Sequence, residues 1–273
     1  MKPTPKSRSE RERYGSERRS PTRRVPMLPA GEPGRRPALQ PLLAFGAHPD
    51  DIEFGCGGVI AKEIQAGRAA HFVVCSRGEA ASHGSPAQRV IEANRSAMLL
   101  GARLEFIELD GDAHLEVRAA HALKLAGIIR RVRPGVVLAP SLVENQHPDH
   151  PRLGQLVRDA CRLARYGGVR DLRRAPPHTI EQLFYYAVTP EAEPDNLTPV
   201  LIDVSAPEIL KLWTAAMEAH ASQAAARNYV ELQLTRARLR GLRAGVGHAI
   251  VLFPNDPLVF GSLAQAGRAA RRF

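Results

Sequence analysis

Two short segments of the chain carry side chains of the types that hold a catalytic metal ion. Residues 47–53 read AHPDDIE, and residues 147–150 read HPDH. Imidazole nitrogens and carboxylate oxygens are common zinc ligands. Neither segment contains a cysteine, so the thiolate-rich set typical of a structural zinc site is not indicated. The residue types therefore point to a metal ion that takes part in a reaction.

The spacing suggests which side chains bind the ion. His48, Asp51 and His150 supply three ligands and leave a fourth position open for water, which is the arrangement of catalytic zinc. Pro49 stiffens the turn, so His48 and Asp51 can converge on one point. Asp50 then lies beside the water, where a base is needed. Either segment alone is also typical of an ordinary turn. Two such segments, each after an expected strand, favour the metal site.

Strands that alternate with helices are expected to position both segments. Apolar runs predict strands at 42–46, 71–75, 104–109 and 135–140. Between and after them, helices are predicted from Gly57 to about Gly67 and at 87–100, 116–132 and 153–164. Nearly all-apolar strands in this alternation are typical of a parallel sheet covered on both faces. Ligands of such sheets bind at the carboxyl ends of the strands, where residues 47–53 and 147–150 are expected.

The last third of the chain has a different pattern. Strands are predicted at 180–188, 200–204 and 249–253, with residues 206–240 mostly helical. The predicted fold class is α/β, a doubly wound, mainly parallel, Rossmann-like sheet with a helical C-terminal portion. We expect one catalytic domain at 41–265, flanked by a basic extension at 1–40 and a basic tail at 266–273.

Composition limits the other classes of function. The chain has 273 residues and a formal charge of +10, of which residues 1–40 supply +7. This Pro- and Arg-rich extension is expected to be disordered, and translation starting at Met27 is one hypothesis. Three cysteines without paired spacing indicate a reducing, cytoplasmic compartment. No apolar run is long enough to cross a membrane.

Two alternatives of another class remain open. Residues 55–58 (GCGG) follow a strand, as in nucleotide-binding oxidoreductases, although the acidic residues before them would repel a pyrophosphate. The basic extension could instead bind nucleic acid. We expect no nucleic-acid partner, because a solvated tail explains this charge as well.

The chain resembles the LmbE/PIG-L family of zinc-dependent N-acetylglucosaminyl deacetylases. Residues 47–51 and 147–150 match the two signature motifs of that family, and the resemblance runs from about residue 42 to about residue 263. The bacillithiol-biosynthesis deacetylases are the most similar subgroup. The stretches that resemble it are residues 77–79, 182–186, 202–205, 221–223 and 257–258.

The resemblance implies a role for each matching residue. The metal ligands are His48, Asp51 and His150, with zinc as the cofactor, one ion per chain. Asp50 matches the general base. His147 matches the histidine that stabilises the tetrahedral intermediate or protonates the leaving amine. The remaining matches are an orienting role beside the ligand loop for Glu53 and substrate-lining positions for Arg89 and Tyr229.

One departure from the family pattern concerns the substrate. Gln146 stands where the family often has an arginine, and it is a candidate substrate-binding residue that removes a positive charge from the pocket rim. A second departure is His248-Ala249-Ile250, where relatives often have Tyr-Ala-Glu.

The reaction implied by the resemblance is hydrolysis of an N-acetyl amide on an amino sugar or its conjugate. A non-sugar amide or a thiol conjugate stays open as the substrate. The resemblance also implies a homo-oligomer, a trimer or a hexamer.

Overall fold

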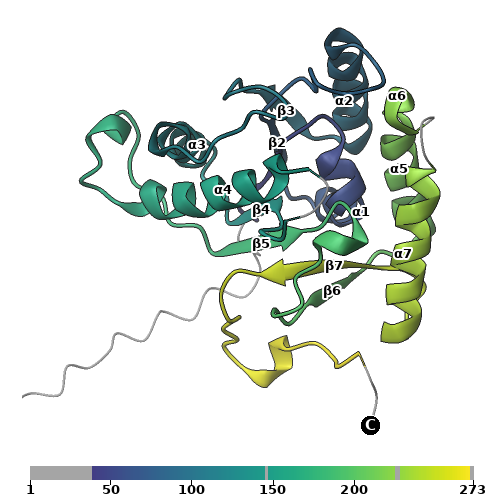
Figure 1. Ribbon diagram of the computed structural model, residues 1–273. Helices are drawn as coiled ribbons and strands as arrows, with labels where there is room; N and C mark the ends of the chain where they lie inside the picture. The colour runs from purple at the N-terminus through teal and green to yellow at the C-terminus, as the bar shows by residue number, and fades with distance from the viewer. Residues whose placement is uncertain (1–38, 145–146, 225–227, 271–273) are drawn as a thin grey trace, which may run out of the picture. The chain divides into compact units, whose positions relative to one another are not determined.

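A seven-stranded sheet forms the centre of the protein in a computed structural model that describes residues 39–144, 147–224 and 228–270 (Figure 1). The order of the strands is β3-β2-β1-β4-β5-β7-β6. The first five strands of this order are parallel, and β7 runs antiparallel to both β5 and β6. The strands are β1 Leu42–Gly46, β2 Ala70–Val74, β3 Arg103–Phe106, β4 Val136–Pro140, β5 Gln182–Tyr186, β6 Val200–Asp203 and β7 Ala249–Pro254. The predicted α/β fold with a mainly parallel sheet is confirmed.

Helices connect the strands as the sequence predicts, but two of them begin earlier. The helix expected from Gly57 begins at Asp51, and the helix expected from Leu153 begins at Asp149. Both candidate metal segments therefore run into the first turn of a helix. The helices are α1 Asp51–Gln65, α2 Pro86–Leu100, α3 Ala119–Val132, α4 Asp149–Arg165, α5 Pro207–Glu218, α6 Ala221–Ala224 and α7 Tyr229–Ala244.

The sheet separates two apolar cores. On one face, α3 and α4 pack over alternate strand residues such as Phe45 and Tyr185. On the other face, α1, α2 and α5 cover residues such as Ala44 and Tyr186, and Trp213 of α5 is buried among them. Figure 1 shows these helices on the two sides of the sheet. Because both faces are covered, the all-apolar pattern of the central strands is explained.

Three glycines of α1 allow the rings of neighbouring residues to pack closely against the helix. An added Cβ at Gly55 would lie 2.1 Å from the Tyr186 ring, and Cβ atoms at Gly57 and Gly58 would lie within 3.1 Å of the Trp213 ring. These glycines lie inside the helix, after its first turn, so they do not form a phosphate-binding loop. The feature that suggested a nucleotide-binding oxidoreductase therefore has another physical cause.

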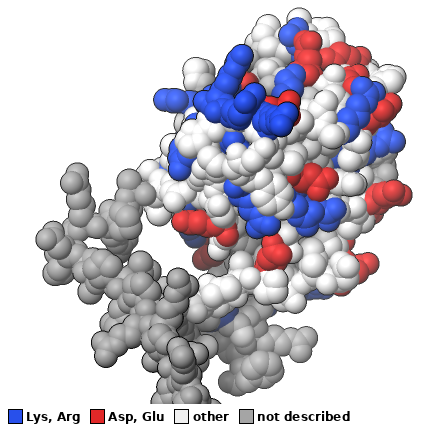
Figure 2. All heavy atoms as spheres, turned by 90° about the vertical axis from the view of Figure 1, so that its left-hand side faces the viewer, with Lys and Arg blue, Asp and Glu red and all other residues white. Residues whose placement is uncertain are grey.

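A buried arginine fixes the segment that follows α4. Arg130, near the end of α3, is 2% exposed. Its guanidinium donates to the backbone carbonyls of Ala164, Tyr166, Leu172 and Ala175. The segment so held exposes Arg165, Arg170, Arg173 and Arg174. Figure 2 faces the left-hand side of Figure 1 and shows Lys and Arg side chains gathered on that surface.

Candidate active site

Asp51 organises the loop between β1 and α1. Its Oδ2 accepts hydrogen bonds from the backbone nitrogens of Ala47 and His48, both at 2.9 Å. Its Oδ1 lies 3.0 Å from Nε2 of His150. One carboxylate oxygen thus shapes the loop, and the other is directed at the imidazole expected to share a metal ion with it. Asp51 is also the first residue of α1, and an acidic side chain is favoured at a helix N-terminus.

The three predicted ligands come together. One donor atom from each of His48, Asp51 and His150 lies within 4.8 Å of the others. His48 lies in the turn after β1, Asp51 is the first residue of α1, and His150 lies in the first turn of α4. Two imidazoles and one carboxylate are a donor set that zinc accepts while keeping a position for water. The residues therefore fit a catalytic divalent ion.

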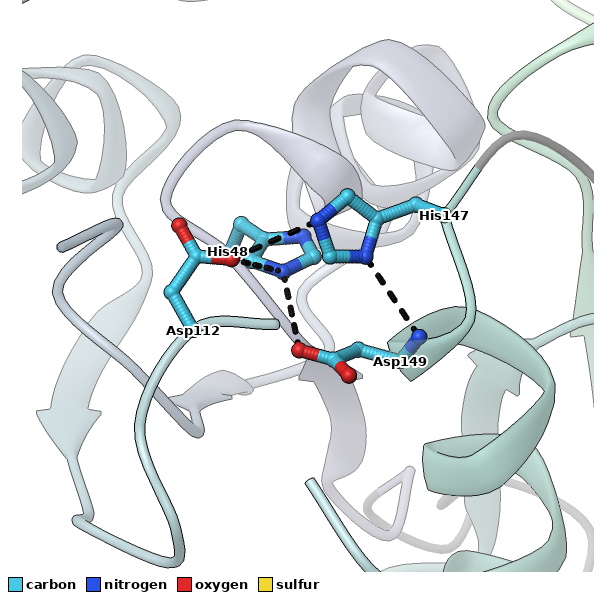
Figure 3. Close-up of side chains that lie close together, drawn as sticks. All are labelled: His48, Asp112, His147 and Asp149. Carbon is cyan, nitrogen blue, oxygen red and sulfur yellow. Dashed lines mark hydrogen bonds and ion pairs between the residues drawn. The ribbon is translucent and has the colours of Figure 1, made fainter. Parts of the chain in front are cut away.

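Two further carboxylates lie against His48 (Figure 3). Nε2 of His48 is 3.0 Å from Oδ1 of Asp112 and 3.4 Å from Oδ2 of Asp149. Burial disfavours the charged imidazole, but the carboxylates of Asp51, Asp112 and Asp149 outweigh burial and raise the pKa of His48 well above its usual value. A pocket that attracts a proton in this way also attracts a metal cation. Asp112 was not found by sequence reasoning.

A second possible ligand set uses the same histidine. His48, Asp112, His147 and Asp149 also bring one donor atom each within 4.8 Å of one another. Nδ1 of His48 lies 3.5 Å from Asp51, whereas Nε2 lies on the side of Asp112 and Asp149. An ion bound on the Asp51 side leaves Nε2 to donate to a carboxylate. Histidine ligands of metals commonly make such a hydrogen bond with the second ring nitrogen.

Asp50 occupies a strained and partly buried position beside the metal set, which we define as His48, Asp51 and His150. Its φ is 114°, in the left-handed region that residues other than glycine rarely adopt. Arg89 of α2 lies 3.3 Å from its Oδ2 and also donates to the carbonyl of Pro49 at 2.8 Å. Burial raises the pKa of Asp50 to about 6, although the charge of Arg89 lowers it. A carboxylate with a raised pKa beside a metal site is suited to accept a proton.

His147 is the more exposed of the two histidines in the second segment. Its side chain is 35% exposed, and its Nε2 lies 3.3 Å from Oδ1 of Asp112. The ring packs against His48 with a distance of 4.1 Å between ring centroids. Nδ1 accepts a hydrogen bond from the backbone nitrogen of Asp149 at 3.4 Å. Asp112 thus contacts both His48 and His147 and can orient the two rings together.

The remaining predicted residues take different positions. Arg89 and Tyr229 both line the same cavity as the metal set. Glu53 is buried behind it, 3.3 Å from Nε2 of His220, and is not among the described residues that line the cavity. Gln146 lies outside the described residues. The substrate roles of Arg89, Tyr229 and Gln146 and the orienting role of Glu53 stay predictions.

The cavity has a volume of about 460 Å³ and opens over the metal set. Acidic and histidine side chains line part of it, among them Asp50, Asp112 and His147. The other lining residues include Ala80, Ala81, Ser82, His83, Val188, Thr189, Gln223 and Tyr229. The volume is within the range of small-molecule sites. A small ligand can therefore reach Asp50 and the donor atoms beside it.

Comparisons with known proteins agree with this site. The family model for PIG-L, described as GlcNAc-PI de-N-acetylase, matches residues 43–161, which include both metal segments. A diacetylchitobiose deacetylase of Thermococcus kodakarensis is 29% identical over 202 residues, 68% of this chain and 70% of the relative. A 4-oxalmesaconate hydratase of Pseudomonas putida is 32% identical over 150 residues, 50% of this chain and 58% of the relative.

A solved structure extends the likeness to most of the fold. The crystal structure of a conserved protein from Thermus thermophilus superposes with a TM-score of 0.69 and 31% identity, and the match covers 81% of this chain and 97% of that one. None of the helices in the described part of the chain has the length and apolarity needed to cross a membrane. With both candidate metal segments inside the matched region, the chain belongs to the PIG-L family of de-N-acetylases.

Proposed function

We propose that the protein is a metal-dependent hydrolase that removes an acetyl group from the nitrogen of an amino sugar. The observation that carries the proposal is the position of Asp50, a partly buried carboxylate with a raised pKa, beside the convergent donors of His48, Asp51 and His150. Membership of a de-N-acetylase family and the likeness to a diacetylchitobiose deacetylase support the choice of reaction and of substrate class.

The proposed roles of the side chains follow from their positions. His48, Asp51 and His150 would hold a zinc or similar divalent ion. When bound, such an ion lowers the pKa of water and polarises a carbonyl. Asp50 accepts the proton of the attacking water. His147, exposed to the cavity and oriented by Asp112, donates to the carbonyl oxygen or to the departing amine. Acetate and a free amine are the products.

The charges around the site support the separate roles proposed for Asp50 and His147. Arg89 neutralises part of the charge of Asp50, and the same guanidinium nitrogen also binds the carbonyl of Pro49. The pKa of the Asp112 carboxyl is held well below its usual range, since hydrogen bonds from His147 and His48 outweigh the effect of its burial. Asp112 therefore stays ionised and stabilises the protonated form that His147 takes during the reaction.

A second candidate reaction is the addition of water to a carbon–carbon double bond. The likeness to a 4-oxalmesaconate hydratase favours it, and an acid–base pair such as Asp50 and His147 could serve it as well. The two reactions differ in their products. Amide hydrolysis releases a primary amine and acetate, whereas hydration consumes an unsaturated acid and releases nothing.

One experiment separates the candidates. The purified full chain, with its metal content measured by elemental analysis, is incubated with N-acetylglucosamine, its β-1,4-linked disaccharide, an N-acetyl amino acid and an unsaturated dicarboxylate. Amine release is followed by fluorescence labelling, and loss of the double bond by absorbance. We expect amine release from the sugars alone, lost after metal removal and restored by zinc. Turnover of the dicarboxylate without amine release would replace the proposal with the hydratase. Full amine release after complete metal removal would contradict the metal-dependent hydrolase.

A further inference from the structure

A second cavity borders the segment that carries His147. Its volume is about 470 Å³, and it lies against the outer side of α4. None of the described residues that line it also lines the cavity over the metal set. Pro148, which follows His147 in the chain, is part of its wall. The segment 147–150 therefore borders both the candidate active site and this second cavity.

Three polar side chains of α4 line the second cavity. Arg152, Gln155 and Arg158 follow one another at intervals of three residues, so they are neighbours along one face of the helix. Each of them carries N–H donors, and the two guanidinium groups are always charged. This face of α4 therefore presents a row of hydrogen-bond donors to the cavity.

Arg158 is a cation without a counter-ion. Its guanidinium makes no hydrogen bond and no ion pair with the residues that the structure describes. Nε is buried, but the side chain as a whole is partly exposed and lines the cavity, so its two terminal nitrogens are the atoms that a ligand can reach. Removing part of a charged group from water is unfavourable unless an opposite charge compensates it. Two terminal guanidinium nitrogens can hold an oxyanion through two parallel hydrogen bonds.

The other polar groups leave the cavity with a net positive charge. The guanidinium of Arg152 donates to the carbonyl of Leu115 at 3.1 Å and lies 3.8 Å from Oδ1 of Asp149, so part of it stays free. The side chain of Gln155 makes no hydrogen bond within the described part of the chain. Glu144 is the one acidic residue among the described residues of the wall, and it is exposed and pairs with neither arginine. Two cations against one carboxylate attract an anion.

The wall opposite these side chains is held in place. A Cβ added at Gly154 would lie 2.4 Å from the carbonyl oxygen of Pro140 and 3.0 Å from Leu142, so α4 packs directly on the end of β4. The backbone nitrogen of Ser141 donates to the carbonyl of Tyr186 at 2.8 Å, which fixes the same segment to β5. Because Leu142 lines the cavity, the hollow is formed before any ligand enters, and less ordering is needed on binding.

We infer that this second cavity binds a small oxyanion, a phosphate or a carboxylate group, through Arg152, Gln155 and Arg158. The terminal nitrogens of Arg158 hold two of its oxygens, while Arg152 and Gln155 supply further donors. A confined hollow suits a small anion, whereas a nucleic acid needs contacts along an extended surface. The site is independent of the proposed reaction, because none of the three side chains lines the candidate active site.

Anion binding to matched variants tests the site. Inorganic phosphate and succinate are titrated calorimetrically, at constant ionic strength, into the full-length wild type, Arg158→Met and Arg162→Met. Arg162 is the control, because it is exposed on the same helix, pairs with Asp159 at 3.3 Å and does not line the cavity. We expect Arg158→Met to weaken the binding of at least one probe by about tenfold or more, the effect of lost hydrogen bonds to a charged group. Arg162→Met should stay within about a factor of two of the wild type. Phosphate bound to a metal ion at the candidate active site would be common to all three proteins and cancels in the comparison.

A second variant and a folding control complete the test. Gln155→Leu should weaken the same probe by about threefold or more, and urea unfolding shows that each variant is folded. Tighter binding of phosphate than of succinate identifies a phosphate as the ligand group, and the reverse order identifies a carboxylate. The site is overturned if neither probe binds the wild type, if Arg158→Met binds both probes as the wild type does, or if Arg162→Met loses as much affinity. A change of oligomeric state in Arg158→Met without any probe binding would instead assign Arg158 to an acidic side chain of a second copy.

Discussion

Two adjacent aspartates at the start of α1 have the same chemistry but different surroundings. Asp51 accepts from two backbone nitrogens and lies against His150. Asp50 has a left-handed backbone and lies against Arg89. Because of this turn in the backbone, one carboxylate is directed toward the donors of the metal set and the other toward the guanidinium. Different effects of the same substitution are therefore expected at the two positions.

Replacing each aspartate by asparagine tests the assignment. Asp50→Asn should keep the metal ion and lose about 10²–10⁴-fold in rate, because an amide cannot accept the proton of water. Asp51→Asn should weaken metal retention, with partial rescue by excess zinc. Zinc per chain and turnover are measured on both variants. Zinc loss in Asp50→Asn together with retention in Asp51→Asn would reverse the two roles.

The pH dependence of the rate should report the ionisation of Asp50. Burial raises its pKa to about 6, and the base works only when deprotonated, so the rate falls as pH drops through the pKa. A bound metal cation favours the ionised form of Asp50 and so lowers its pKa. The acid limb of the pH–rate profile should therefore lie at or below about pH 6 in the metal-loaded enzyme. Arg89→Met removes a charge that lowers this pKa and should move the limb to higher pH.

The control for Arg89→Met is Arg95→Met, on an exposed position of the same helix. Its pH profile should match that of the wild type. Thermal melting of both variants shows whether the loss of the buried guanidinium alters folding. An acid limb that stays in place in a folded Arg89→Met enzyme would mean that another group controls the rate.

The sequence could predict the motif residues of the site but not all of their neighbours. His48, Asp51 and His150 were found because each lies in a short run with several possible ligands. Asp112 was missed because residues 110–113 (DGDA) have the composition of an ordinary turn. Only the topology brings it to His48, since its loop follows β3 at the same edge of the sheet.

The starts of α1 and α4 show where local rules mislead at the scale of elements. The helix after β1 was predicted to begin only at Gly57, but close packing against Tyr186 and Trp213 requires small residues within a helix that already begins at Asp51. Pro151 lies in the first turn of α4, where no helical hydrogen bond from its nitrogen is needed, so this helix begins at Asp149 rather than at the predicted Leu153. The local apolar pattern contains neither the tertiary packing of α1 nor the tolerance of proline in a first turn.

The close contact at Gly55 leads to a stability prediction. Gly55→Ala places a Cβ 2.1 Å from the Tyr186 ring, which is closer than the two groups can pack. The substitution should lower the free energy of unfolding by about 1–3 kcal/mol through overpacking. Gly127→Ala in α3 is the matched control, because its nearest neighbour would be 3.8 Å away. It should raise the free energy of unfolding by about 0.5–1 kcal/mol. Urea unfolding of both variants measures the difference, and equal effects would show that the contact is not restrictive.

At the scale of the whole molecule, the strand order places both metal segments at one edge. The loops after β1 and β4 carry them, and these two strands are neighbours in the sheet. Alternation of strands and helices was enough to predict this edge. The sequence could not predict that β7 lies between β5 and β6 and runs antiparallel to both, because an apolar run does not encode its direction or its neighbour.

The basic N-terminal extension is predicted to be dispensable for catalysis. Residues 1–40 supply +7 of the formal charge of +10, and their composition is typical of disorder. Removing them should leave kcat, KM and the melting temperature nearly unchanged. Activity assays and thermal unfolding of the shortened and full chains check this. A fall of several degrees in melting temperature would show that the extension stabilises the fold.

The contact between α1 and α5 would link the affinity for the proposed metal ion to the packing of the C-terminal helices. Trp213 donates to the carbonyl of Glu53 at 2.8 Å, in the first turn of the helix that begins with Asp51. An ion that binds only the correctly docked helix stabilises that docked state by mass action. Loosening of the C-terminal helices would then first appear as weaker metal affinity, and added metal would partly restore the docking. In thermodynamic terms, the occupancy of the site measures the integrity of this remote interface.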